Sequence, residues 1–264
     1  MRKYWQVAKN TWEESVIYRV NFLMWRIRTV LQFLTVYFLW STLIPSNSSF
    51  LGYSHSQILS YLLGTTIVAS IVFATRTHEI GDNINSGDLS IFLLKPLNYF
   101  FYWFARDAAD KGFNLLFCTI ELTILYTLLR PPLFVQKDFF LIILFFISIF
   151  LAVVLNFFIG SLLGLIGFWS PEVWAPRFIF FTLLTFFAGA LFPLDILPVG
   201  VFQISQLLPF SYLLYSPLKI YLGQLSFPQI LNGFVVSGFW IILFCFFTRS
   251  VWLKGLRSYT ALGR

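Results

Sequence analysis

The chain has 264 residues, of which 58% are hydrophobic and only 11% charged, whereas a soluble domain is about 45–50% apolar and roughly 25% charged. One soluble domain of this length cannot bury so much apolar surface, so that surface must face lipid. The net charge of +7 comes from positive residues scattered between apolar stretches, with no basic run that would bind nucleic acid. Because no alternating strand pattern repeats, the sequence predicts an all-α integral membrane protein without a nucleic-acid partner.

The first 25 residues lack the apolar core and the small-residue cleavage site of a signal peptide. Their apolar side chains share one face of a helix, and these are Trp5, Ala8, Trp12, Val16, Val20 and Leu23. The sequence therefore predicts an amphipathic elbow helix over residues 1–26, lying on the inner leaflet of the bilayer.

Six apolar stretches follow that are candidates for crossing a bilayer, which takes roughly 20 residues of helix, and the fourth is longer than one crossing needs. The predicted spans are 27–44, 57–75, 112–129, 139–169, 178–192 and 229–248. If the N-terminus is cytoplasmic, all but three of the 18 Lys and Arg residues fall on the cytoplasmic side. This asymmetry predicts that both termini are cytoplasmic, with an even number of crossings in one transmembrane domain over residues 1–264.

Residues 76–111 form the longest predicted cytoplasmic loop. Within it, residues 85–87 (Asn-Ser-Gly) are a turn signal, Asp88 is placed to cap a short helix, and Pro96 ends that helix. The helix has one apolar face, made of Leu89, Phe92 and Leu93. Such a face indicates burial against lipid headgroups or against a partner protein, and the periodicity alone leaves both open.

Residues 193–227 are too apolar for a solvated outer loop and contain several prolines. This composition predicts broken, re-entrant helices in the outer leaflet, where protein or water must cover the backbone.

Polar and small residues inside the spans are few. Glu121 is the one acidic residue well inside a predicted span, so it should face protein or water, either in a transport pathway or in a hydrogen bond between helices. Gly160 and Gly164 form a Gly-x-x-x-Gly pattern of the kind that brings helices close together.

Motifs for catalysis are missing from the sequence. It contains no phosphate-binding loop of the form G-x-x-x-x-G-K-[ST], no HExxH and no GxSxG. The two histidines, His55 and His78, fall on opposite sides of the membrane in the predicted topology. We therefore expect no catalytic, cofactor-binding or metal-binding residue in this chain.

The order of these elements resembles that of the membrane subunit of a type 2 ABC exporter, and more closely the branch known as an uncharacterised ABC transport system permease. The residues that carry the resemblance look like the family's turn and coupling segment, and they are Glu79, Gly87, Asp88, Leu89, Phe92, Leu93, Lys95 and Pro96. The resemblance implies ATPase subunits that bind ATP and dock on the coupling helices of two permease subunits, identical or different. It also implies export across the cytoplasmic (inner) membrane of a bacterium.

Two other interpretations remain at this point. The chain could be a proton-coupled secondary carrier that uses Glu121, or a membrane scaffold that transports nothing. An integral membrane enzyme with an unfamiliar site is a variant of the second interpretation. The substrate cannot be read from the sequence, since an apolar pathway suits lipids, amphipathic peptides and hydrophobic drugs alike.

Overall fold

The computed structural model describes residues 2–17, 19–44, 49–50 and 52–260, and nearly all of the regular structure in them is helical. A two-stranded antiparallel hairpin, β1 (Ser49–Phe50) and β2 (Tyr53–Ser54), is the only sheet in the described part of the chain. The helices are α1 (Arg2–Ile17), α2 (Arg19–Leu43), α3 (His55–Val72), α4 (Glu79–Asn85), α5 (Asp88–Leu93), α6 (Tyr99–Leu129), α7 (Phe139–Gly164), η1 (Leu165–Phe168), α8 (Trp174–Phe187), η2 (Leu194–Ile196), α9 (Val199–Leu207), η3 (Pro209–Tyr212), α10 (Tyr215–Tyr221) and α11 (Phe227–Ser258).

Five helical segments are long and apolar enough to cross a membrane, and they are Phe22–Leu43, His55–Val72, Tyr99–Leu129, Phe139–Phe168 and Phe227–Ser258. They confirm the prediction of an all-α membrane protein with several crossings. The stretch predicted as a fifth span, residues 178–192, corresponds to α8, which has only 14 residues. At 1.5 Å per residue α8 is about 21 Å long, short of a hydrocarbon core of about 30 Å.

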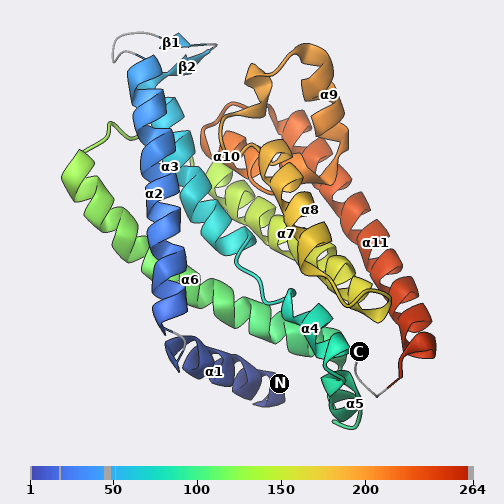
Figure 1. Ribbon diagram of the computed structural model, residues 1–264. Coiled ribbons are helices and arrows are strands. Elements are labelled where there is room, and N and C mark those ends of the chain that lie inside the picture. The colour runs from blue at the N-terminus through green and yellow to red at the C-terminus, as the bar shows by residue number, and fades with distance from the viewer. Residues whose placement is uncertain (1, 18, 45–48, 51, 261–264) are drawn as a thin grey trace.

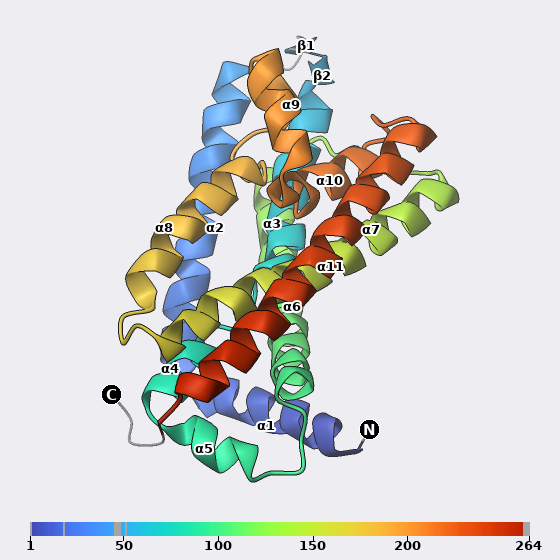
Figure 2. The ribbon, with the colours of Figure 1, turned by 90° about the vertical axis from the view of Figure 1, so that its right-hand side faces the viewer.

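The short helices gather at the two ends of the bundle. Figures 1 and 2 show α1, α4, α5 and the C-terminal end of α11 at one end, and the hairpin and α9 at the other. The first and last long helices, α2 and α11, therefore begin and end on the same side of the bundle. We call the end with α1, α4 and α5 the coupling end.

Helix α6 begins at Tyr99, so the last part of the region expected as a loop, 76–111, is helical and continues without a break into the predicted span 112–129. Asn98 caps the helix by accepting a hydrogen bond from the backbone N–H of Phe101 at 3.1 Å. The next three turns contain Arg106, Asp107 and Lys111, whose charges interrupt the apolar pattern but are compatible with a helix. The resulting helix of 31 residues is about 46 Å long, so its first turns extend to the coupling end.

Helix α1 packs its small polar side against α6 and leaves its apolar side open. Thr11 and Ser15 are buried, while Trp5 and Val16 are exposed. The Trp12 indole N–H donates to the carbonyl of Ala109 in α6 at 2.6 Å. Most of the apolar face recognised in the sequence therefore points away from the protein, and Trp12 at its edge contacts α6.

The main core lies between α3, α7 and the inserted helix α10. Its fully buried members include Ile58, Leu62, Leu155 and Leu218. Gly64 of α3 lets α10 approach closely, because a Cβ there would lie 2.5 Å from the Leu218 side chain. Residues 193–227 thus fold into short helices that are partly buried in the protein.

A buried polar cluster ties α10 to the hairpin and to η2. The Lys219 ammonium donates to the Tyr53 hydroxyl at 2.8 Å, to Asp195 Oδ2 at 2.8 Å and to Gln224 Oε1 at 2.6 Å. The Tyr53 hydroxyl in turn donates to Asp195 Oδ1 at 2.8 Å. The Lys219 ammonium is therefore paired with a carboxylate and with neutral oxygen acceptors. A charge buried in apolar surroundings requires such partners.

Candidate functional site

Helices α4 and α5 form a tight pair at the coupling end. Gly87 joins them with φ of 84°, a left-handed conformation that favours glycine. Its carbonyl accepts hydrogen bonds from the Ser90 hydroxyl at 2.7 Å and the Tyr259 hydroxyl at 2.9 Å. Asp88 was expected to cap α5, but it lies in the first turn, where its carboxylate accepts from the Ser86 hydroxyl at 2.7 Å. Gly87 occupies the capping position instead, without a side-chain hydrogen bond.

The apolar face predicted for docking is largely internal, and this is a second correction. Leu89 is 0% exposed and Phe92 is 6% exposed. They pack with Ile80 and Trp103 in a cluster between α4, α5, α6 and η1, and the ring of Phe92 meets that of Tyr99 edge-on at 5.0 Å. The i, i+3 spacing identified a buried face correctly, but the face packs inside this chain.

The tip of α5 presents a different apolar surface. Ile91 is 58% exposed, Leu93 48% and Leu94 87%, and the neighbouring Lys95 and Pro96 are also exposed. We call Ile91, Leu93 and Leu94 the α5 tip. Of the three side chains predicted for docking, only Leu93 belongs to it.

A groove of about 550 Å³ runs beside the tip. It is lined by acidic, basic and aromatic side chains, among them Glu79, Asp82, Asp88, Lys95, Trp103 and Arg106. The groove is open and polar, which suits contact with a protein surface better than enclosure of a small ligand.

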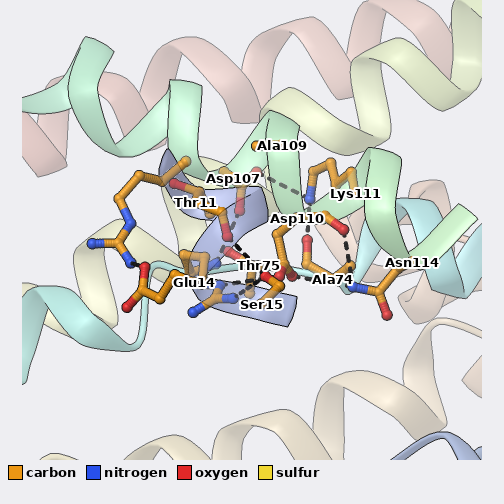
Figure 3. Close-up of polar contacts among 12 residues, drawn as sticks. Thr11, Glu14, Ser15, Ala74, Thr75, Asp107, Ala109, Asp110, Lys111 and Asn114 are labelled. Atoms are coloured by element: carbon orange, nitrogen blue, oxygen red, sulfur yellow. Dashed lines mark hydrogen bonds and ion pairs between the residues drawn. The ribbon is translucent and has the colours of Figure 1, made fainter. Parts of the chain in front are cut away.

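Ion pairs tie the start of α4 to α1 and α6. Arg76 contacts Glu79 at 2.8 Å and Asp110 at 3.0 Å, and Arg106 contacts Glu79 at 2.9 Å and Glu14 at 2.6 Å. A further bond runs from Arg76 Nη2 to the Ser15 hydroxyl at 2.8 Å. Burial alone would lower the pKa of Arg76, but the hydrogen bond with Glu79 and the charge of Asp110 outweigh it and raise the pKa. Figure 3 shows Glu14 and Ser15 of α1 facing this network.

Lys111 of α6 closes the end of α3. Its ammonium donates to the carbonyl of Val72 at 3.3 Å. It also donates to the carbonyl of Ala74 and pairs with Asp107 at 3.0 Å (Figure 3). The Asn156 amide of α7 donates to the same Val72 carbonyl at 2.7 Å. These side chains satisfy carbonyls that a helix leaves free at its C-terminus. They fix the point at which the chain leaves α3 for α4.

Glu121 is paired, and sequence reasoning missed its partner. Arg26 of α2, only 4% exposed, donates Nε to Glu121 Oε1 at 2.7 Å and Nη2 to Oε2. The sequence had placed Arg26 in the elbow helix, whereas α2 continues from Arg19 and α6 crosses it obliquely (Figure 1). The only hint of this partner in the sequence is the position of Arg26, a positive residue near the inner end of the first predicted span. The free carboxylate on which a carrier mechanism depended is thus held in a two-pronged ion pair.

Gly160 and Gly164 of α7 form a close contact with the segment that starts α4. A Cβ at Gly160 would lie 2.2 Å from Thr77 Oγ1, and one at Gly164 would lie 2.8 Å from the Thr77 carbonyl and from Ile80 Cβ. The Gly-x-x-x-Gly pattern therefore joins α7 to the α4–α5 pair within one chain.

Together these features define a multi-pass helical membrane protein whose most elaborate polar structure lies at one end of its spans. In the described part of the chain, no group of three or more His, Cys, Asp or Glu side chains could hold a metal ion. Its family follows from comparison with known proteins. The model of the family described as "ABC-2 family transporter protein" matches residues 30–263, so the chain belongs to that family. No curated protein matches the chain. It is an ABC-2 permease, a membrane component of a transport system.

Proposed function

We propose that the chain is the permease subunit of an ATP-driven exporter in the cytoplasmic membrane of a bacterium. It forms the substrate pathway with a second permease subunit, identical or different, and a separate ATPase subunit binds and hydrolyses ATP. The observation that carries the proposal is the α5 tip, an exposed apolar surface on a short helix pair at the coupling end. An exposed apolar group at the end of a rigid element is typical of an anchor for a partner protein.

The contacts behind the tip suit it to transmit movement. Leu89 and Phe92 fix α5 to α6 and η1. Arg76 and Arg106 fix α4 to α1 and α6. A partner that displaces the tip therefore moves the inner ends of several helices together, since packed interiors shift as units.

A charge placed in the α5 tip tests the proposal. Leu94→Asp and Ile91→Asp add a carboxylate that must lose water when a partner docks. Loss of an anchor at the centre of an interface commonly costs about 2 kcal/mol, or roughly thirtyfold in affinity. We expect weaker capture of the ATPase and loss of efflux in the same membranes, with the permease inserted at normal levels.

Asn10→Asp is the matched control. Asn10 is exposed on α1 at the coupling end, and Asp can still accept the hydrogen bond from Gln6 that Asn10 accepts at 3.0 Å. This variant adds the same charge away from the tip and should keep both activities. Normal ATPase capture and normal efflux in both tip variants would mean that α5 only rests on the bilayer, and the proposal would fail.

A further inference from the structure

Helix α2 has a buried side and an outward side of different character. Its buried side chains recur every three or four residues, and they are Arg26, Phe33, Tyr37 and Trp40. At about 100° per residue, the outward side carries the exposed side chains of Arg28, Gln32, Thr35 and Thr42. Exposed apolar side chains, among them Met24 and Leu39, share this outward side with the polar ones. We call the row formed by Arg28, Gln32, Thr35 and Thr42 the α2 stripe.

Gln32 is the residue in the stripe that lipid cannot accommodate well. It lies near the middle of the apolar segment Phe22–Leu43. Thr35 and Thr42 donate their hydroxyls to backbone carbonyls one turn earlier, at 2.9 and 3.0 Å, so they are satisfied within the helix. Among the described residues, the Gln32 amide has no hydrogen-bond partner. An amide in hydrocarbon without a partner is costly, so something polar must meet it.

Arg28 adds a charge to the same side of the helix. It is exposed one turn closer to the coupling end, and its guanidinium lies 4.8 Å from the ring centre of Trp25. In a symmetric pair of α2 helices in dry contact, the two Arg28 side chains would approach each other, and like charges at that distance repel. Water and polar solute beside the stripe would satisfy both Arg28 and Gln32.

We propose that the α2 stripe is a wall of a hydrated substrate pathway and that Gln32 hydrogen-bonds the substrate at mid-membrane. This inference rests on the proposed function, since it names where the exported molecule passes. The substrate class that fits is an amphipathic molecule whose polar head group accepts and donates hydrogen bonds. Arg28 at the inner end favours a head group with negative charge over one with positive charge.

Cysteine labelling tests the pathway without depending on the ATPase. In a background with Cys118→Ala and Cys245→Ala, Gln32→Cys and Thr35→Cys are treated in intact membranes with a permanently charged methanethiosulfonate. Leu31→Cys is the matched control, because Leu31 is exposed at the same depth but lies on the apolar flank of the stripe. An apolar environment raises the pKa of a thiol, and one unit reduces the reactive thiolate about tenfold. We expect the stripe cysteines to react about tenfold faster than Leu31→Cys or more.

Two results would overturn the proposal. Equal, slow labelling at all three positions would place Gln32 against lipid. Slow labelling together with an oxidative cross-link between two Gln32→Cys chains would place it in a dry contact between subunits. Either result leaves the ATPase capture experiment untouched, so the failure of this inference and that of the proposed function are distinguishable.

Transport gives an independent readout. Gln32→Leu should lower efflux about tenfold while ATPase capture stays normal, because one hydrogen bond to a buried polar group is worth about 1.5 kcal/mol. Gln32→Asn, which keeps the amide, should retain most of the efflux. Equal efflux in Gln32→Leu and the unaltered protein would refute a role for the amide in substrate contact.

Discussion

The Arg26–Glu121 pair shows how far single residues could be understood from the sequence. The cost of a carboxylate inside a span predicted correctly that Glu121 avoids lipid. The partner could not be predicted, because it depends on the angle at which α6 crosses α2 and not on any pattern within either helix. The same limit applies to Leu89 and Phe92, because helical periodicity predicts which side chains share a face but not which surface covers that face.

The two members of the pair should respond differently to removal of the partner. Glu121→Leu leaves a guanidinium that cannot lose its proton, whereas Arg26→Met leaves a carboxylate that can take one up. Breaking a buried pair by removing one partner costs about 3–5 kcal/mol. We expect Glu121→Leu to lie near the upper end of that range and Arg26→Met below it, measured by thermal unfolding of the purified protein.

The double variant Arg26→Met with Glu121→Leu is the control, and it should recover much of the lost stability. Equal losses in all three variants would contradict a functional ion pair. If efflux persisted in Glu121→Gln but no longer depended on a proton gradient, the carrier interpretation would replace the exporter proposal.

Among the helices, the α4–α5 pair and α6 show where pattern reasoning succeeded and where it stopped. The turn signal and Pro96 located α5 closely. The sequence does not predict the start of α6, because charged residues in the first turns of this helix interrupt its apolar pattern, and their partners lie on α1 and at the end of α3. The position of α4 depends on α7, where two glycines allow close contact with the start of α4. This contact cannot be predicted from the sequence of α4 alone.

Gly164→Ala should loosen this contact between α7 and α4. The new methyl group would lie 2.8 Å from the Thr77 carbonyl and from Ile80 Cβ, and overpacking of this kind costs about 1–3 kcal/mol. We expect a lower unfolding temperature and reduced coupling of ATP hydrolysis to efflux. Gly238→Ala is the matched control, because nothing lies within 4 Å of its added Cβ. Because Ala has a higher helix propensity than Gly, Gly238→Ala should keep or slightly raise the unfolding temperature. An unfolding temperature in Gly164→Ala as high as in Gly238→Ala would contradict the close contact between α7 and α4.

For the molecule as a whole, the distribution of charge and the arrangement of the helices both indicate the same orientation in the membrane. Arg76, Arg106 and Lys111 all lie in polar networks at or near the coupling end. Lys219, one of the three positive residues predicted outside, is buried against Asp195 and contributes little free positive charge to its surface. Pairing therefore removes free positive charge at both ends of the bundle, and the Lys and Arg residues remain far more numerous on the side of the coupling end, which favours a cytoplasmic coupling end.

Reporter fusions test this orientation. A reporter inserted after Gly223, which follows α10, should behave as external, and one joined to the C-terminus should behave as cytoplasmic. The measurement is the activity of a reporter enzyme that works on only one side of the membrane. Both reporters on the same side would refute the six-crossing topology, because α11 (Phe227–Ser258), which lies between the two insertion points, would then not cross the bilayer. An internal reporter after Gly223 together with an external C-terminal reporter would mean that α8 does not traverse the bilayer.

If α8 crosses the bilayer, as the sequence predicts for residues 178–192, its short length makes this permease sensitive to bilayer thickness. The longer apolar helices can match a thicker membrane by tilting less, but α8 falls short of the hydrocarbon core by about 9 Å. Hydrophobic mismatch costs a fraction of a kcal/mol per Å, and the bilayer can reduce this cost by thinning around the shorter helix. The acyl chain length of the surrounding lipids thus acts mainly on one helix of the bundle. A thinned patch beside α8 would also shorten the path between the two leaflets at that side of the protein.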